Sequence, residues 1–456
     1  MDNFFNLNKL VVGATYEQER KLIWLYLWLL IFEGALRKWF LPDLQQPLVL
    51  IREPIVIYLF FLGIQRGWLK SCYVTTMMIV STICFLLTLI IGHHNLIVAC
   101  FGWRIYFFHF SFVFIMGKVL TRDDILKMTR FMLYISIPMT ILIILQFFSP
   151  QTAWVNRGIG GNMDGAGFGG AMGYYRPSGT FSFISGLNDF QGVVGCLLFY
   201  YLVANRYIGE KNHIPYWILL IMLIGYLIAI PTCISRTQLL QSVVYFLSLC
   251  IAMVCSQRVK LSYIPYVIGM FILIGLLLSS GMVDTQLEVF NTRIETASEI
   301  EGGMEGTIGN RYFGSFLRGI LNPDLPICGY GLGLGTNFGA KFMGGDWKSF
   351  GFNGEEEWSR VTGECGIILG CVILWVRLFF SFKVWYIGYR LLFKNRDILP
   401  WMLSIGVLLK FSKGMWAVPT NLGFSLLFAG LALAAIRTST PVVPQTETKQ
   451  KRKIHK

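Results

Sequence analysis

Charged side chains are scarce in this sequence of 456 residues. Asp, Glu, Lys and Arg make up 14% of the chain and hydrophobic residues 55%, whereas soluble domains carry about 25% charged residues. Such a shortage argues against a soluble multi-domain enzyme, because that class of protein needs a polar surface. The apolar content also excludes a disordered chain, since disordered segments have too few apolar residues to form a core.

Motifs for metals, disulfides and nucleotides are also missing. The ten cysteines form no CxxC pair and most lie in apolar runs, as is typical of small buried hydrophobic residues. The five histidines show no HExxH or other ligand spacing. The GxGxG run at 331–335 follows no strand and precedes no Walker lysine, so we expect it to pack closely or to line a substrate site. We therefore expect no metal and no cofactor.

Long apolar runs are what the sequence has in abundance. A spanning helix needs roughly 20 mostly apolar residues. The runs predict an all-α polytopic membrane protein with about 12 transmembrane helices and a large, partly helical periplasmic loop between spans 9 and 10. No cleavable signal is expected, because polar and mixed residues precede the first run. The predicted spans are 21–40, 47–64, 73–92, 95–117, 125–148, 187–205, 214–233, 237–255, 262–281, 359–380, 399–416 and 421–436.

These spans divide the chain into alternating membrane and loop segments. Three groups of helices, at 21–148, 187–281 and 359–436, are separated by two long connections, at 149–186 and 282–358. The larger connection begins with an acidic stretch, 284–305, that we expect to form a surface helix. The remaining segments are an N-terminal stretch at 1–20 and a basic tail at 437–456.

The net charge of +14 indicates how the chain is oriented in the membrane. If the N-terminus is cytoplasmic, the inside segments hold 23 of the 39 basic residues and eight of the 25 acidic ones. The spans and outer loops then carry a net charge near zero. This distribution predicts that both termini are cytoplasmic and that both long loops lie on the outer face, and it gives no reason to expect a nucleic-acid partner.

Several ionisable residues fall inside predicted spans, where charge is costly and is often functional. Glu33 and Arg37 are four residues apart and share a helix face, Arg52 lies near the start of the second span, and Arg104 lies midway along the fourth. One interpretation is a structural network of ion pairs. The other is that these side chains line a polar cavity that supports a site.

Arginines and glutamates at the outer ends of the spans suggest chemistry. Arg176, Arg236 and Arg311 lie where little other positive charge is found, and a guanidinium suits bidentate phosphate binding. We interpret them as a site for an anion such as a lipid pyrophosphate. Alternatively, Arg236 snorkels at the membrane interface.

The glutamates precede or enter the tenth span. Glu355 and Glu357 belong to an acidic run that is either a solvated helix N-terminus or contains a general base for an acceptor hydroxyl. Glu364 lies about two turns further in, where solvation explains it less well.

Six short motifs, in order, resemble the superfamily of O-antigen ligases and O-antigen (Wzy-type) polymerases, which are bacterial membrane glycosyltransferases. The resemblance is strongest over about 174–370. Two N-terminal motifs resemble an exopolysaccharide-associated branch. The motifs are FEGALRKWFLP (32–42), IREPIVIY (51–58), RPSGTFSFISGLNDFQG (176–192), SRTQLL (235–240), NRYFGSFLRGILNPDLPICGYGLGLG (310–335) and EEEWSRVTGECGIILG (355–370).

The resemblance implies transfer of a glycan from undecaprenyl pyrophosphate to an acceptor hydroxyl at the periplasmic face of the bacterial inner membrane, with inversion and without a metal. It assigns the pyrophosphate to Arg236 and Arg311, with Arg176 as a third ligand. The ligases carry a histidine before the helix with the E-x-G step. Here Glu364-Cys365-Gly366 matches that step, but the histidine position falls at or near Glu355. This departure favours a polymerase over a ligase acting on lipid A core.

The expected partners are an undecaprenyl-pyrophosphate-linked oligosaccharide and membrane lipids, with other polysaccharide assembly proteins as further candidates. Three alternatives stay open from the residues alone. One is a ligase that moves the glycan to a lipid or protein acceptor, the second is a transporter or flippase of lipid-linked sugars, and the third is a structural membrane scaffold. Transporters place critical charges near the membrane midplane, and Arg104 fits that class best.

Overall fold

The structure is a computed structural model that describes residues 16–165, 167–255, 284–301, 325–344 and 356–439, with single positions between 269 and 283 and at 352 and 354. Over these residues the chain is helical, with one isolated β-bridge between Gly169 and Tyr175 and no strand. Nine described helical segments are long and apolar enough to cross a membrane. The chain is therefore an all-helical, multi-pass membrane protein.

The helices follow one another with short connections except at the two long loops. The described α-helices before the first long loop are α1 (Glu17–Ala35), α2 (Glu53–Gln65), α3 (Cys72–Ile90), α4 (Leu96–Arg104), α5 (Phe110–Val119) and α6 (Arg122–Phe148). The middle group is α7 (Ile184–Ala204), α8 (Tyr216–Thr232) and α9 (Arg236–Cys255). The later helices are α11 (Asp284–Glu301), α14 (Asn337–Phe342), α15 (Glu357–Cys365), α16 (Ile367–Asn395), α17 (Ile398–Lys410) and α18 (Pro419–Arg437).

Two π-helical turns and several short 3₁₀ turns connect these elements. The π turns are η1 (Leu36–Phe40), which extends α1, and η4 (Ile105–His109), which joins α4 to α5. The 3₁₀ turns are η2 (Pro42–Leu44), η3 (Pro47–Leu50), η5 (Trp154–Asn156), η6 (Ile159–Gly161), η7 (Asn205–Tyr207) and η8 (Glu210–Asn212). Both π turns lie beside charged residues inside the bundle, and such turns are frequent at functional sites.

Nine of the twelve predicted spans overlap the nine apolar segments. The first predicted span, 21–40, is helical as α1 and η1 but is not among the nine. The ninth, 262–281, lies largely outside the described residues. The eleventh, 399–416, is wrong in its extent, because α17 ends at Lys410 after 13 residues. The predicted surface helix in 284–305 is confirmed as α11.

The tenth predicted span, 359–380, is also wrong in its boundaries. Instead of one helix there are two, α15 and α16, separated at Gly366, whose φ of +78° and ψ of 166° are open only to glycine. A Cβ atom at this position would lie 2.0 Å from the carbonyl oxygen of Ile327. Glu364 is therefore not part of the membrane-crossing helix but of a short helix that precedes it.

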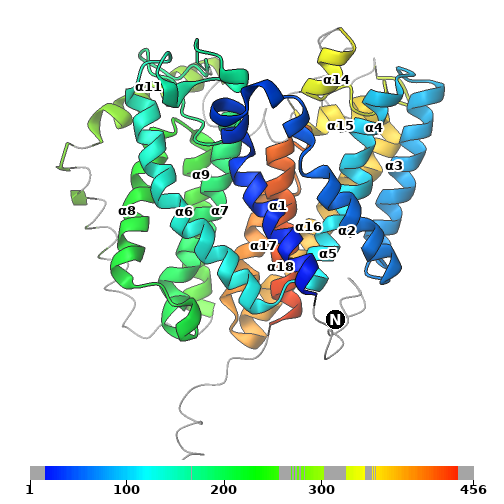
Figure 1. Cartoon of the computed structure of the whole chain (residues 1–456). Helices are drawn as coiled ribbons and strands as arrows, with labels where there is room; N and C mark the ends of the chain where they lie inside the picture. The colour runs from blue at the N-terminus through cyan, green and yellow to red at the C-terminus, as the bar shows by residue number, and fades with distance from the viewer. Residues whose placement is uncertain are drawn as a thin grey trace, which may run out of the picture.

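The bundle has two distinct ends (Figure 1). The start of α1 and the end of α18 lie at one end, which we call the terminal face. There Arg20 Nε lies 3.2 Å from Asp124 Oδ2, and Arg437 donates to the carbonyl oxygens of Gly117 and Leu120. The helices α11, α14 and α15 lie at the opposite end, the loop face. Both long connections therefore project from the same face, as the charge pattern predicted.

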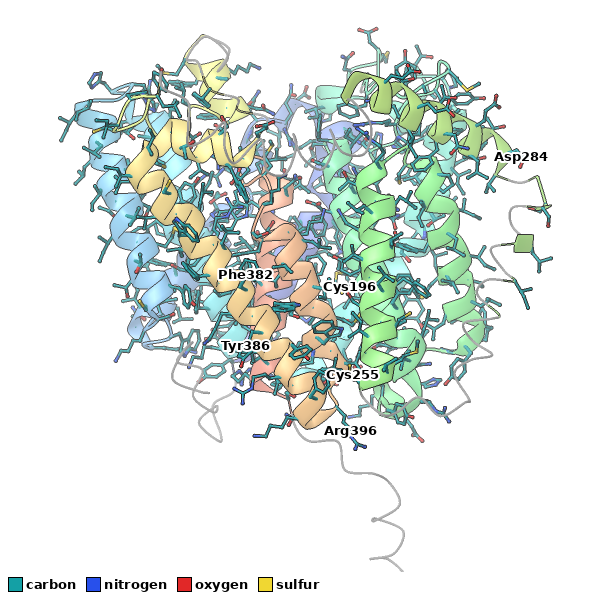
Figure 2. All side chains as sticks on the ribbon, turned by 180° about the vertical axis from the view of Figure 1, so that it is seen from behind. Cys196, Cys255, Asp284, Phe382, Tyr386 and Arg396 are labelled. Carbon is teal, nitrogen blue, oxygen red and sulfur yellow. The ribbon has the colours of Figure 1, made fainter. Side chains whose placement is uncertain are left out.

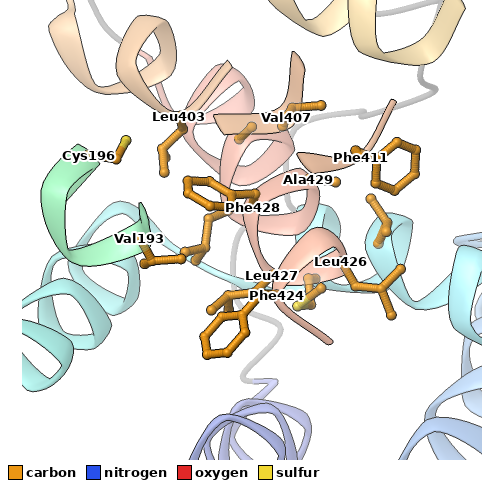
Figure 3. Packing of buried hydrophobic residues seen from close by; sticks show 14 of the residues in the cluster. Val193, Cys196, Leu403, Val407, Phe411, Phe424, Leu426, Leu427, Phe428 and Ala429 are labelled. Carbon is orange, nitrogen blue, oxygen red and sulfur yellow. The ribbon is translucent and has the colours of Figure 1, made fainter. Parts of the chain in front are cut away.

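Helices α7 and α18 form the centre of the bundle. In the apolar stretches of these two segments, 89% and 83% of the residues are buried. Phe428 of α18 packs with Leu403 and Val407 of α17 (Figure 3), and Phe424 packs against Phe181 and Phe190. Small residues allow α18 to approach its neighbours closely: a Cβ at Gly430 would lie 2.4 Å from Met116 Cε of α5. In a membrane, such close van der Waals contact stabilises helix association, because lipid supplies no hydrophobic driving force.

Candidate functional site

The connection between α17 and α18, residues 411–418, brings buried charges together near the loop face. At 1.5 Å per residue, α17 is about 20 Å long and too short to cross a hydrocarbon core of about 30 Å. Its connection to α18 therefore lies at membrane depth, where non-helical backbone needs partners from the protein. Arg377 donates to the carbonyl oxygens of Phe411 (3.2 Å) and Gly414 (2.7 Å). Arg52 donates to that of Pro419 at 3.1 Å.

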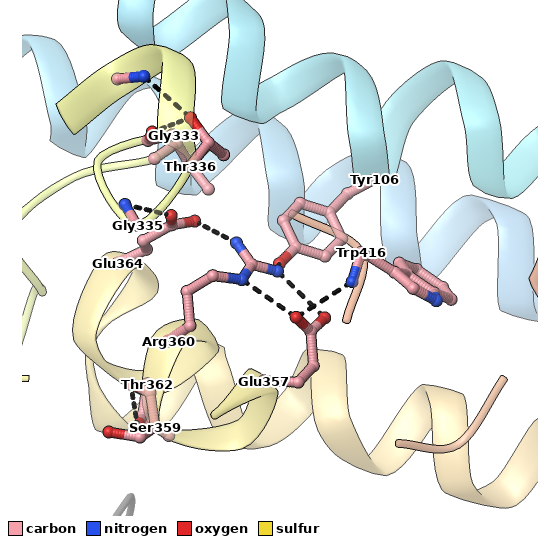
Figure 4. A network of polar contacts seen from close by, with 12 residues as sticks. Tyr106, Gly333, Gly335, Thr336, Glu357, Ser359, Arg360, Thr362, Glu364 and Trp416 are labelled. Carbon is pink, nitrogen blue, oxygen red and sulfur yellow. Dashed lines mark hydrogen bonds and ion pairs between the residues drawn. The ribbon is translucent and has the colours of Figure 1, made fainter. Parts of the chain in front are cut away.

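Arg360 is the centre of an ion-pair network that contacts this connection (Figure 4). Its Nε and Nη2 donate to the two carboxylate oxygens of Glu357, each at 3.0 Å, and its Nη1 donates to Glu364 Oε2 at 2.7 Å. Nη2 also donates to Tyr106 OH at 3.0 Å. The Arg360 side chain is completely buried. Because one turn of helix separates the three charged residues of α15, they share one face.

The two carboxylates of this network use both of their oxygens. Glu357 also accepts from Arg377 Nη1 and from the backbone N–H of Trp416 (3.1 Å), while Glu364 Oε1 accepts from the N–H of Gly335 (2.8 Å). Two carboxylates thus neutralise two buried guanidiniums. A general base at Glu357 or Glu364 would require one of these ion pairs to open, so the contacts favour a structural role for both. Glu355 lies outside the described residues.

The glycine run at 331–335 packs closely against α4 and α15, as one of the two predicted roles requires. Gly333 has a φ of +86°, and a Cβ there would lie 2.3 Å from the carbonyl oxygen of Val98. The preceding Tyr330 donates its N–H to the carbonyl of Gly363 at 2.8 Å. The run therefore fixes α15, and with it Arg360, against the membrane helices.

A second group of charges connects α1, α2 and η4. Arg37 Nη1 lies 3.4 Å from Glu33 Oε1, so the pair predicted from their spacing is confirmed, and Arg52 Nε donates to Glu33 Oε2 at 3.0 Å. Arg104 pairs with Glu53, and His109 Nε2 lies 3.5 Å from the same carboxylate. Buried Nε of Arg104 and Oε2 of Glu53 have no hydrogen-bond partner. The network is mostly paired, which agrees with the structural interpretation.

Arg176 lies in a different environment at the loop face. Its loop packs on the turn between α8 and α9, where Tyr174, Phe147, Ile234 and Val289 form a small apolar cluster. Within the described part of the chain, no carboxylate lies within ion-pair distance of Arg176, and its buried Nε has no hydrogen-bond partner. Burial and the neighbouring Arg293 guanidinium of α11 lower the pKa of Arg176 to about 10, so it remains a cation at neutral pH.

The structure brings one further predicted arginine to this region. Arg236 is the first residue of α9 and follows the α8–α9 turn, whose Cys233 is close enough to interact electrostatically with Arg176. Arg311 lies outside the described residues. The first turn of α9 also presents backbone N–H groups, and a helix N-terminus favours anions. Arg176 and Arg293 are therefore two neighbouring guanidiniums close to the α8–α9 turn, and we call this pair the arginine cluster.

Sequence reasoning missed Arg293, Arg360 and Arg377. Arg377 had the clearest signal, since it is a charge inside a long apolar helix. Arg360 has glutamates three residues before it and four after it, which is ion-pair spacing on a helix. Arg293 had no signal in the sequence, because it lies in an acidic segment and only the fold brings it close to Arg176.

The described residues contain no cluster of three or more His, Cys, Asp or Glu side chains that could hold a metal ion. Comparisons of the chain with protein-family models, with curated proteins and with solved structures found no match.

Proposed function

We propose that this protein is a polysaccharide polymerase, which transfers a glycan from undecaprenyl pyrophosphate to a sugar hydroxyl of another lipid-linked repeat unit. The observation that carries the proposal is the arginine cluster. Arg176 lies beside Arg293, and among the described residues no carboxylate forms an ion pair with Arg176. Two nearby cations at the end of a membrane bundle are unfavourable unless an anion binds between them. A lipid pyrophosphate is an anion that arrives at this depth.

The chemistry requires charge stabilisation more than it requires a cofactor. Negative charge develops on the departing pyrophosphate, and fixed guanidinium groups stabilise it without reorganisation in the transition state. Guanidinium–phosphate hydrogen bonds are charge-assisted and often bidentate. The acceptor hydroxyl loses its proton to a base, for which Glu355, Glu357 and Glu364 are the candidates from the sequence. Glu355 is the best of these, because the other two are held in ion pairs.

Orientation supports the same proposal. Basic residues near the terminal face include Arg20, Arg66, Arg122 and Arg437, and the positive-inside rule assigns that face to the cytoplasm. The loop face, with the arginine cluster, then faces the periplasm of a bacterial inner membrane, where lipid-linked glycans are presented for polymerisation.

The test is chain extension by purified protein supplied only with an undecaprenyl-pyrophosphate-linked oligosaccharide. We expect Arg176→Ala and Arg293→Ala each to lower the rate by about 100-fold, which is the usual effect of removing one transition-state donor. Arg390→Ala is the matched control, because this exposed arginine of α16 lies outside the cluster. Full activity in both cluster variants would refute the pyrophosphate site. Extension only after lipid A core or a protein acceptor is added would instead identify a ligase.

A further inference from the structure

A buried ion pair joins α7 to the end of α17. Lys410, the last residue of α17, pairs with Asp189 of α7, and both side chains are at least nine-tenths buried. One cation and one anion in contact leave no net charge. Charged residues inside a membrane bundle are expected to mark a site or to tie helices together, and neither the pyrophosphate site nor the Arg360 network uses this pair.

Within the part of the chain that the structure describes, four polar side chains of α7 and α9 have buried atoms without a hydrogen-bond partner. Gln191 of α7 and Gln238 of α9 are 1% and 0% exposed, and neither the amide nitrogen nor the amide oxygen of either has a hydrogen-bond partner. Gln241 Oε1 and Tyr245 OH are also buried without a partner. A buried polar group without a partner costs about 1–3 kcal/mol. The number of such groups on two neighbouring helices indicates that a ligand supplies the missing hydrogen bonds.

The four side chains are carried by α7 and α9, which pack side by side (Figure 1). A Cβ at Gly192 would lie 2.4 Å from Gln241 Oε1 and 3.7 Å from Lys410 Cε, so Gln241 is adjacent to the ion pair. One turn further along, Tyr226 OH lies 2.6 Å from Ser242 Oγ, and a Cβ at Gly195 would lie 2.2 Å from the same hydroxyl.

This contact also fixes the position of the two glutamines. Gln191 is one turn before Gly195 on α7, and Gln238 is one turn before Ser242 on α9. Both helices start at the loop face, so the two glutamines occupy neighbouring turns on that side of the Tyr226 contact.

The polar region borders an apolar core. Val193 and Cys196, on the other turns of α7, face the apolar core formed with Leu403 and Phe428 (Figure 3), and Cys196 lies near the middle of the bundle (Figure 2). From Gln238 in the first turn of α9 to Tyr245 about two turns later, the unpartnered side chains therefore lie on α7 and α9 beside this apolar core. We call Asp189, Gln191, Gln238, Gln241, Tyr245 and Lys410 the amide site.

We propose that the amide site binds a neutral, hydroxyl-bearing ligand. The ligand must both donate and accept, because each of Gln191 and Gln238 offers an unpartnered donor and an unpartnered acceptor. A metal cation would leave the amide N–H groups unpaired, and an anion would leave the carbonyl oxygens unpaired. The paired charges of Asp189 and Lys410 favour no ion. Two sources supply such hydroxyl groups: ordered water molecules held in the bundle, or a sugar of the lipid-linked substrate.

The experiment measures the Tm of purified protein in detergent for Gln191→Met and Gln238→Met, which keep side-chain length and remove the amide. Each is measured alone, with undecaprenyl pyrophosphate, and with undecaprenyl-pyrophosphate-linked monosaccharides. Gln65→Met, at the exposed end of α2, is the control for the exchange itself and should leave Tm unchanged. The readout is stability, so its failure is separate from a failure of the polymerase assay.

Three outcomes are possible, and each decides the proposal. A Tm several degrees below wild type in protein alone supports a water-filled site, because the variant loses bonds that water had made. A sugar site is supported if the variant has a higher Tm than wild type in protein alone but a lower Tm than wild type with the sugar-linked lipid. That second result rests on the proposed function. A Tm that is raised or unchanged under every condition overturns the proposal, since it shows that the amides have no ligand to lose.

Discussion

Two arginines near the loop face, Arg360 and Arg176, differ in almost every respect except residue type. Arg360 is completely buried and pairs with Glu357 and Glu364, and it also donates to Tyr106. Arg176 is half-buried, its buried Nε has no hydrogen-bond partner within the described part of the chain, and the neighbouring Arg293 lowers its pKa. The first arrangement is complete without a ligand and the second is not. Arginine alone therefore does not identify a site in this protein; what distinguishes Arg176 is that no carboxylate among the described residues pairs with it.

The largest effect is expected from Glu357→Ala. This change leaves Arg360 and Arg377 with a single remaining carboxylate, Glu364, and removes the acceptor for the N–H of Trp416. Breaking a buried ion pair costs about 3–5 kcal/mol, which is a large part of the stability of a typical protein. We expect little folded protein, measured as the monodisperse fraction in detergent and as Tm.

Glu357→Gln provides the matched comparison, because the amide oxygen still accepts hydrogen bonds. Its loss of stability should be smaller. If instead Glu357→Ala folds with the wild-type Tm and loses only chain extension, then Glu357 is the general base. The Arg360 network would then be part of the catalytic site and not a purely structural arrangement.

An intermediate effect is expected from Glu33→Ala. The change removes the carboxylate shared by Arg37 and Arg52, but Arg52 keeps its contact to the carbonyl of Pro419. The free energy of unfolding should fall by about 2–3 kcal/mol, as for hydrogen bonds to charged groups. Urea unfolding followed by tryptophan fluorescence would measure it. An unchanged stability with a raised KM for the lipid-linked donor would favour the polar-cavity interpretation of this group.

The smallest effect on stability is expected from Arg176→Glu. The new carboxylate would lie beside Arg293 and replace a repulsion by an attraction, which at a half-exposed position stabilises by less than about 1 kcal/mol. Tm should therefore stay the same or rise slightly. At the same time, binding of pyrophosphate, measured by titration calorimetry, should be lost. A clear fall in Tm would show that Arg176 has a structural role after all.

Much of the fold could be predicted because the length and hydropathy of a membrane helix can be recognised in the sequence. Nine predicted spans correspond to observed helices, and the common face of the two long loops followed from the positions of Lys and Arg. The Glu33–Arg37 pair followed from helical spacing alone. These are local properties of the chain, so one sequence is enough to reveal them.

The failures occur where contacts between distant segments override local pattern. The residues 359–365 are amphipathic and lead directly into an apolar run, yet Gly366 breaks the helix because the 327–335 segment packs against it. The spacing of α17 gives no hint that its helix stops at Lys410, since the partners of the following backbone are Arg377 and Arg52. The arginine cluster likewise depends on α11 reaching the turn between α8 and α9.

The central position of α18 has a consequence for how the protein is made. This helix is the last of the described helices to leave the ribosome, yet it contacts α5, α7 and α17 in the middle of the bundle. The side chains that hold the connection before it, Arg52, Glu357 and Arg377, are all synthesised earlier. The bundle must therefore stay open in the membrane until α18 arrives. Of the two central helices, α7 is made first, and α18 joins it only after α8, α9, α16 and α17 have been made.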